Sequence, residues 1–429
     1  MTTLPATTPF TLGLIDPAGS VEPIVPLPAN LPFTFTSGPS VYPGSSGSTS
    51  QLRNTSAVWT WLLADAAGNA LCELTTAAGK QIVFKRNTLS EATCTISHED
   101  EAASLLWTAL MNTGVPTLRC YRRGANDTIA VDRFNGYLAP FAEDAEEQAT
   151  LSLVFRSPFG RLIGDGSTSG RFLVPELAPF VAVDAGQIAK ALIDAANADS
   201  FTGLATTGAI IPSKIRNRTY PLGQNIGQAV INLTNVLDGF DFVETPVDGG
   251  GTTLAALSIA PSMGVDRPDV RFEYGADTLA NVRKVSRTVA PPVNVAMVIG
   301  ANGLTSVKTD EASIAVYGKW PTLISQTDVT EQATLDDKAW ALLRPKPTRV
   351  IQFTPDPALA PLPWDDYVLG DTCRFFARRG ALAEDVAVKI NAFSVVIGTE
   401  GEESFAIADP LTPDGAATLQ SSLSVEVTS

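Results

Sequence analysis

The stretch Pro361-Leu-Pro-Trp-Asp-Asp-Tyr-Val-Leu-Gly-Asp-Thr-Cys-Arg-Phe-Phe-Ala-Arg-Arg-Gly380 carries the clearest strand and turn signals of the chain. A turn at Gly370 and Asp371 leads into a β-rich run, and a second run of alternating apolar residues covers 386–397. Alternating apolar residues bounded by Gly and Asp predict two antiparallel strands with one buried and one solvated face. This region therefore favours a β fold.

The length and composition indicate a large, sparsely charged protein. The chain has 429 residues, of which 45% are hydrophobic and 17% are charged. Because single cores stop growing at about 250–300 residues, this length predicts two to four domains. The 33 glycines and 30 prolines favour strands and turns. Such a composition fits a subunit of a larger assembly, and it fits a mostly β secreted protein equally well.

The net charge of −15 argues against binding of nucleic acid, because neutralising phosphates requires clustered Lys and Arg. No Lys or Arg precedes Arg53, so the positive start of a signal peptide is missing. No apolar run reaches the roughly 18 residues of a membrane-spanning helix, so we expect no membrane insertion by this chain.

Few residues suited to catalysis or metal binding are present. The cysteines at 72, 94, 120 and 373 form no CxxC pair, so they are expected to be small buried hydrophobes in a protein made in a reducing cytoplasm. His98 is the only histidine, which excludes most Ser–His triads and His-based metal sites. A surface or capping role is expected for it.

The pattern of elements divides the chain into regions. A hairpin whose turn holds Asp65, Gly68 and Asn69 opens a series of short strands, followed by helices and further strands. Strands are predicted at 58–65, 71–74, 82–85, 92–96, 117–123, 133–138, 150–155, 240–244, 253–259, 293–299 and 316–324. Helices are predicted at 99–111, 185–198 with Asp184 as N-cap, 226–237 and 334–343.

Several of these motifs resemble those of the tail-tip baseplate hub, a minor tail protein that closes the tail of long-tailed bacteriophages. The Gly370-Asp-Thr entry, the Arg378-Arg-Gly380 exit and the closing strand resemble the last β-barrel of these hubs. The tryptophan hairpin and Arg133-Phe-Asn-Gly-Tyr137 resemble the first. Thr354-Pro-Asp-Pro357 and Pro363–Tyr367 are most similar to hubs of phages that infect actinobacteria.

The resemblance implies a mainly β fold with a minor α+β part: two small hub β-barrels and an inserted α+β domain. It assigns the first barrel to 51–165, the inserted domain to 166–287, and the second barrel with a short helix to 288–410. Composition predicts an extended Pro/Ser/Thr-rich arm at 1–50 and a flexible tail at 411–429. The uncharged arm is expected to dock either on a neighbouring protein or on its own domain.

The resemblance also implies the function. We expect a structural virion protein without enzymatic activity, catalytic residues, cofactor or metal, assembled as a homotrimer at the tail tip after synthesis in the host cytoplasm. The implied partners are the distal tail protein ring, the tail tube, the tape measure protein, and a central fibre or other minor tail proteins. Viral DNA passes through the lumen only during ejection.

Alternatives to this interpretation rest on short motifs. A wall-binding or glycan-cleaving loop could use Asp365 and Asp366 as its carboxylate pair and Trp364 and Tyr367 as sugar-stacking rings; the opposing interpretation is a solvated loop anchored by a buried Trp364. The acidic runs 143–147 and 400–403 are expected to be solvated hairpin tips or to line a lumen. The third alternative is a receptor-binding adhesin. Adhesins are usually separate terminal β domains, and this chain offers none.

Overall fold

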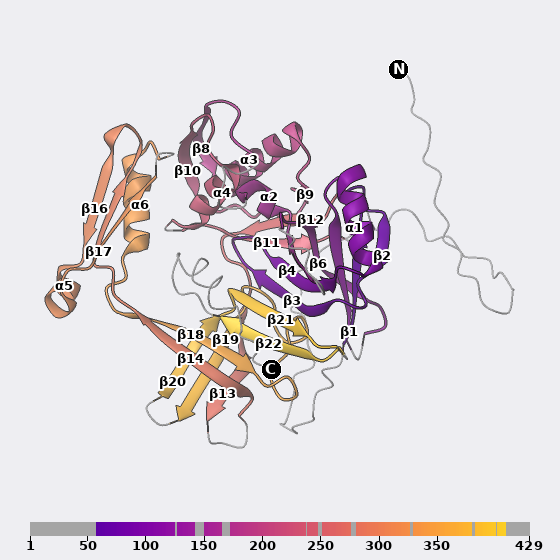
Figure 1. Cartoon of the computed structure of the whole chain (residues 1–429). Helices are drawn as coiled ribbons and strands as arrows, with labels where there is room; N and C mark the ends of the chain where they lie inside the picture. Colours follow the sequence, from indigo (N-terminus) through magenta and orange to yellow (C-terminus); the bar gives the residue numbers. More distant parts are fainter. Residues whose placement is uncertain are drawn as a thin grey trace, which may run out of the picture. The chain divides into compact units, whose positions relative to one another are not determined.

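The computed structural model describes residues 57–408 except 125–126, 142–149, 165–171, 237, 248–250, 276–279, 327–328, 380–381 and 400. The described residues are mainly β with a minor helical part, as the sequence predicted (Figure 1). The predicted arm (1–50), the predicted tail (411–429) and the acidic run 143–147 lie outside them. Among the described helices, none is long and apolar enough to cross a membrane.

Half of the described strands belong to one sheet with the order β14-β18-β22-β21-β3-β4-β7-β6-β5-β1-β2, and all neighbouring strands in it are antiparallel. The strands are β1 (Val58–Ala64), β2 (Ala70–Glu73), β3 (Ala78–Lys85), β4 (Glu91–Ser97), β5 (Thr117–Arg123), β6 (Val131–Leu138), β7 (Thr150–Arg156), β14 (Val282–Ala290), β18 (Thr348–Pro355), β21 (Ala392–Ile397) and β22 (Glu403–Ala408). The predicted helix after β4 is α1 (Glu101–Asn112), and the Asp100 side chain caps it by accepting a hydrogen bond from the Ala102 backbone N–H.

The large sheet joins two parts of the chain that are far apart in sequence. β21 pairs with β3, so Phe393 lies opposite Phe84 and Val395 lies opposite Ile82. Strands assigned from the sequence to two barrels, at 51–165 and 288–410, therefore continue one another in a single sheet. Closure into two barrels and the bounds of the domains stay predictions.

The stretch around Gly370 lies in a three-stranded sheet of β13 (Asp266–Gly275), β19 (Thr372–Arg379) and β20 (Leu382–Lys389). β19 and β20 are antiparallel, which confirms the predicted pair, and β13 adds parallel to β19. The single strand predicted over 386–397 is wrong, because the chain leaves the sheet after Lys389. The Ile390 N–H donates to the Asp371 carbonyl (2.8 Å) and Ile390 O accepts from Gly370 N–H (2.8 Å), so the next strand, β21, enters the large sheet instead.

The predicted α+β insertion has its own core. Its strands are β8 (Ala178–Asp184), β9 (Leu204–Ala205), β10 (Ile215–Tyr220), β11 (Asp241–Pro246) and β12 (Ala255–Ala260), and its helices are α3 (Ala185–Asp199) and α4 (Ile226–Thr234), with the short α2 (Phe159–Ile163) packed against them. Asp184 accepts from the Gly186 N–H (2.9 Å), so the predicted N-cap of α3 is confirmed. The apolar face of α3, from Ile188 to Ala196, is buried in this core.

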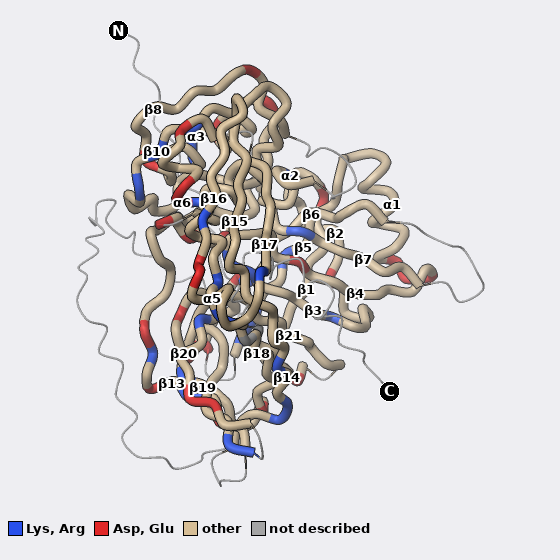
Figure 2. Tube along the Cα trace, turned by 90° about the vertical axis from the view of Figure 1, so that its left-hand side faces the viewer, with Lys and Arg blue, Asp and Glu red and all other residues tan. Residues whose placement is uncertain are grey.

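A third unit follows β14. It contains β15 (Val295–Ile299), the 3₁₀ turn η1 (Ala301–Gly303), β16 (Thr305–Thr309), α5 (Glu311–Tyr317), β17 (Pro321–Ser325) and α6 (Gln332–Leu342). The strand predicted over 316–324 is wrong at its start, because Asp310 caps α5 through the Ser313 N–H (2.8 Å) and residue 317 still belongs to that helix. Gly318, at φ 75°, ends α5 before β17 begins. Figure 2 views the chain from the side on which β15, β16 and β17 lie.

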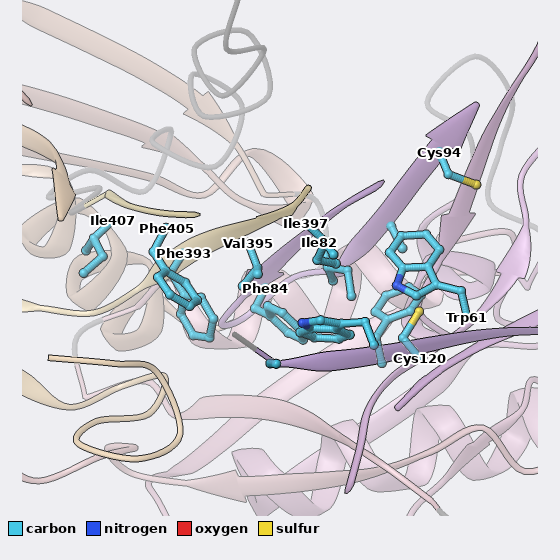
Figure 3. Close-up of a cluster of buried hydrophobic side chains, with 14 of the residues drawn as sticks. Trp61, Ile82, Phe84, Cys94, Cys120, Phe393, Val395, Ile397, Phe405 and Ile407 are labelled. Carbon is cyan, nitrogen blue, oxygen red and sulfur yellow. The ribbon is translucent and has the colours of Figure 1, made fainter. Parts of the chain in front are cut away.

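The largest hydrophobic core is built from both distant parts of the chain, and Figure 3 shows a portion of it. The labelled residues are Trp61, Ile82, Phe84, Cys94 and Cys120 from the first part and Phe393, Val395, Ile397, Phe405 and Ile407 from the last. Cys94, Cys120 and Cys373 are buried as free thiols, as predicted, whereas Cys72 is half-buried. The core thus depends on contacts that no local sequence pattern encodes.

Candidate functional site

The loop singled out from the sequence, between β18 and β19, is a tight turn held by its own backbone. The Trp364 N–H donates to the Tyr367 carbonyl (2.7 Å), and the Asp366 N–H donates to the Leu362 carbonyl (3.0 Å). Trp364 has φ 68°, in the left-handed region that a bulky residue rarely adopts. Because such a conformation persists only when its surroundings fix it, the packing of Trp364 decides the shape of the loop.

The Trp364 ring lies among aromatic and cationic side chains. Its centroid is 5.3 Å from that of Phe84 and 5.4 Å from that of Phe393, both in edge-on geometry. The guanidinium groups of Arg122 and Arg133 lie 5.2 and 4.9 Å from the ring centroid, within cation–π range. Trp364 therefore anchors the loop through contacts on several sides, but it is half-buried and not buried as the non-catalytic interpretation predicted.

Tyr367 lies inside the protein. It is 1% exposed, and its ring meets those of Phe272 (5.6 Å) and Phe393 (6.3 Å) edge-on. Burial raises the pKa of its hydroxyl well above the ordinary value. The pair of stacking rings proposed for a sugar is therefore not presented on one surface.

The two adjacent carboxyl groups have different roles. Asp366 accepts a hydrogen bond from the Leu362 backbone N–H at Oδ2 (2.8 Å), which helps to close the turn. Asp365 is exposed at the tip of the loop. Partial removal from water raises the pKa of Asp365, Arg122 opposes that shift, and Asp127 adds to it. One carboxyl group thus supports the backbone while the other faces solvent.

Beneath the loop lies a buried ion pair that sequence reasoning missed. Arg122 donates from Nε to Glu403 Oε1 (2.7 Å) and from Nη2 to Oε2 (2.9 Å), and Trp59 Nε1 donates to the same Oε1 (2.6 Å). Arg122 and Glu403 are each 2% exposed. Burial lowers the pKa of Arg122, but the hydrogen bonds and charge of Glu403 outweigh burial and raise it.

The prediction that 400–403 is a solvated hairpin tip is wrong for Glu403. This residue begins β22, and it shares its inward face with Phe405 and Ile407. The two-residue alternation Glu-x-Phe-x-Ile in the sequence indicates that Glu403 is buried, because residues i, i+2 and i+4 of a strand point to one side. An acidic residue at the start of an apolar strand face needs a buried cation, and Arg122 supplies it.

The motif Arg133-Phe-Asn-Gly-Tyr137 joins the large sheet to the inserted α+β region. The Asn135 amide donates to the Leu254 carbonyl (3.0 Å), just before β12. At Gly136 a Cβ atom would lie 2.7 Å from the Arg156 carbonyl oxygen, so only glycine permits the close approach of β7. Tyr137 holds Arg161 of α2 over its ring at 4.6 Å.

A cavity of about 580 Å³ opens at this junction. It is lined by Phe84, Trp364 and Phe393 from the aromatic cluster, by Arg133 and its neighbours on β6, and by residues 243–246 of β11. Burial and the neighbouring Arg122 lower the pKa of Arg133. The cavity is therefore mainly apolar with one half-buried guanidinium group on its wall.

Glu244 on β11 lines this cavity and holds the start of α2. Its carboxylate accepts from the Phe159 backbone N–H (2.8 Å) and from the Ser157 hydroxyl. Burial raises the pKa of Glu244 to about 7 although both hydrogen bonds act in the opposite direction. The charge of this junction therefore changes close to neutral pH.

Metal and histidine chemistry find no support in the described residues. No three His, Cys, Asp or Glu side chains among them are grouped so that they could hold a metal ion. His98 is exposed in the turn after β4, and Asp100, not His98, caps the following helix. The expected absence of catalytic residues and cofactors stays a prediction.

The chain matches no protein-family model and no curated protein. Among solved structures it is similar to a tail protein from Neisseria meningitidis (12% identity, 81% of this chain and 95% of that one, TM-score 0.47). It is also similar to the prophage tail protein gp18 from Listeria monocytogenes (11%, 85% and 98%, TM-score 0.48) and to the 43 kDa tail protein of prophage MuSo2 from Shewanella oneidensis (12%, 83% and 98%, TM-score 0.47). These three similar structures are tail proteins, whereas other similar structures include Francisella PdpA–VgrG complexes and an E. coli type VI secretion component.

Proposed function

We propose that the chain is the baseplate hub at the tip of a long-tailed phage, a homotrimer that closes the distal end of the tail. It joins the tail tube and the distal tail protein ring to the tip, contacts the tape measure protein and a central fibre or other minor tail proteins, and opens for ejection of the DNA. The phrases Thr354–Pro357 and Pro363–Tyr367 favour a phage of actinobacteria. The protein is made in the host cytoplasm and ends in the virion.

The observation that carries this proposal is the pairing of β21 with β3. The hub resemblance implies two β regions that flank an α+β insertion, and strands from both β regions lie side by side in one sheet with a common core. The insertion has a separate core and is attached at the Arg133–Tyr137 motif and at Glu244. This arrangement supports a structural role and not a catalytic one.

The test is the symmetry and mass of the protein in particles. Cryo-electron microscopy of purified virions is expected to show three copies in a ring at the tail tip, and light scattering of the isolated protein to give three times the chain mass. Single copies in the particle, or virions without the chain, would contradict the proposal.

We further propose that the chain is not an enzyme. The support is that Tyr367 is buried, Trp364 is packed and Asp366 closes the turn, which leaves Asp365 without a second free carboxylate in this loop. The assay is release of reducing sugar from purified actinobacterial cell walls by the wild type and by Asp365→Asn. No release by either is expected. Release by the wild type that Asp365→Asn abolishes would establish the glycan-cleaving alternative.

A further inference from the structure

The cavity of about 580 Å³ beside the Trp364 loop has the size of a site for a small organic molecule, since such sites enclose about 300–1,000 Å³. Its wall is mainly apolar and includes Val243, Met263 and Leu369. Phe84 and Phe393, whose ring centroids are 5.0 Å apart, lie side by side in that wall (Figure 3). Burial of apolar surface can therefore hold a molecule in this cavity.

One charged side chain on the wall has no partner among the described residues. Arg133 Nε is buried and receives no hydrogen-bond acceptor there, and the described carboxylates near the guanidinium group act on it only through their charge. Its closest charge-stabilising neighbour is the ring of Trp364, whose centroid lies 4.9 Å away. A guanidinium group stays protonated, so a positive charge remains half-buried at the edge of an apolar cavity.

The second arginine at the same ring shows what a charge in this place requires. Arg122 lies 5.2 Å from the centroid of Trp364, and the Glu403 carboxylate accepts two hydrogen bonds from it, at 2.7 and 2.9 Å. The pKa of Arg122 is raised by that partner, whereas burial and the charge of Arg122 lower the pKa of Arg133. A buried charge is costly unless it is paired, so Arg133 lacks the carboxylate that Arg122 has.

The two acidic groups of the wall are bound to the protein itself. Asp132 accepts a hydrogen bond from the Asn135 amide (2.7 Å), and Glu244 accepts one from the Phe159 backbone N–H (2.8 Å). Among the described residues that line the cavity, Arg133 is the only cation. The cavity can therefore pair one negative charge of a ligand, and a second would meet acidic groups.

We propose that this cavity binds a small monocarboxylic acid with an apolar chain. The ligand carboxylate accepts hydrogen bonds from the guanidinium group of Arg133, and the chain lies against the rings of Phe84 and Phe393. Bonds between a guanidinium group and a carboxylate are roughly twice as strong as neutral hydrogen bonds. The site lies within one chain, so this inference goes beyond the proposed hub and is tested independently of its symmetry.

The first test uses the wild-type protein and isothermal titration calorimetry at neutral pH. The probes are hexanoate, octanoate and decanoate, and we expect the affinity to rise about fourfold for each CH₂ group that is buried. Octanol has the same chain as octanoate without the charge, so we expect it to bind at least tenfold more weakly. Equal affinity for octanol and octanoate would overturn the role of the guanidinium group.

A variant then tests the residue. Arg133→Met removes the charge and keeps an apolar side chain, so we expect the affinity for octanoate to fall at least tenfold. The matched control is Arg123→Met, which makes the same change at an exposed position of β5 that does not line the cavity. The control is expected to bind like the wild type, and a folded Arg133→Met protein that does so as well overturns the inference.

A third measurement locates the ligand in the wild type and covers the case in which Arg133→Met does not fold. Brief oxidation modifies accessible methionines, and saturating decanoate is expected to slow the oxidation of Met263, on the cavity wall, several-fold. Met111, which is 73% exposed on α1, is the internal reference and should be unaffected. Unchanged oxidation of Met263, or no saturable binding of the three acids, overturns the inference, also if an acidic peptide binds instead.

Discussion

Removal of the Glu403 charge is expected to destabilise the whole β region. In Glu403→Gln the guanidinium group of Arg122 stays charged and 2% exposed, but its bidentate partner is gone. The amide oxygen can still accept from Trp59, whereas the amide nitrogen meets the Arg122 donors without an acceptor. Breaking a buried ion pair from one side costs about 3–5 kcal/mol, a large part of a typical stability of about 5–15 kcal/mol.

The assay is urea unfolding followed by tryptophan fluorescence, since Trp59 hydrogen-bonds to the altered group. The control is Asp194→Asn, which breaks the pair between Lys190 and Asp194 on α3, where both side chains are more than a third exposed. Exposed pairs contribute roughly 0–1 kcal/mol, so this variant should unfold close to the wild type.

A double variant separates the pair from its surroundings. In Arg122→Met/Glu403→Leu no charge is left buried, so we expect it to recover more than half of the stability lost in Glu403→Gln. If Glu403→Gln lost no more than Asp194→Asn, the ion pair would be solvated and the account of the shared core would be refuted.

Three further predictions follow from single sites. Glu244 has a pKa of about 7 in the folded protein against an ordinary value of 4.5. Its contribution to the free energy of unfolding, at most about 3 kcal/mol, is therefore fully present below pH 4.5 and is lost as the pH rises through 7. Glu244→Gln should flatten the pH profile of unfolding between these limits, and an unchanged profile would contradict the assignment. Gly264→Ala should destabilise more than Gly303→Ala, although both have positive φ (81° and 77°), because its Cβ would lie 2.0 Å from backbone whereas Gly303 faces open space; equal melting temperatures would refute this. In the folded protein the half-buried Cys72 should react with a thiol reagent before Cys120, because burial raises the pKa of the Cys120 thiol well above its ordinary value. Faster labelling of Cys120 would show that its site opens.

The elements that could be predicted from the sequence are those with local signals. Helix α3 was predicted together with its cap, because Asp184 and the apolar spacing from Ile188 to Ala196 lie within a single segment. The hairpin β1–β2 was predicted for the same reason, since turn residues and two-residue alternation are short-range patterns.

The elements that could not be predicted depend on contacts between distant residues. The run 386–397 is uniformly strand-like, and only the hydrogen bonds of Ile390 to the Gly370–Asp371 turn divide it between two sheets. At the loop, the anchoring role of Trp364 was predicted, but its two arginine neighbours come from β5 and β6. The burial of Glu403 depends on Arg122, which is 281 positions away in the sequence.

Three kinds of contact hold the two distant β regions together around their shared core. β3 and β21 pair in one sheet although their residues are more than 300 positions apart, and Arg122 and Glu403 add a polar contact between the same two regions. The segments in between have their own cores. A force that pulled the two β regions apart would therefore have to break the sheet pairing, the aromatic cluster at Trp364 and the ion pair together. The free energy that resists separation of the two β regions then comes from all three contacts together and not from the weakest of them.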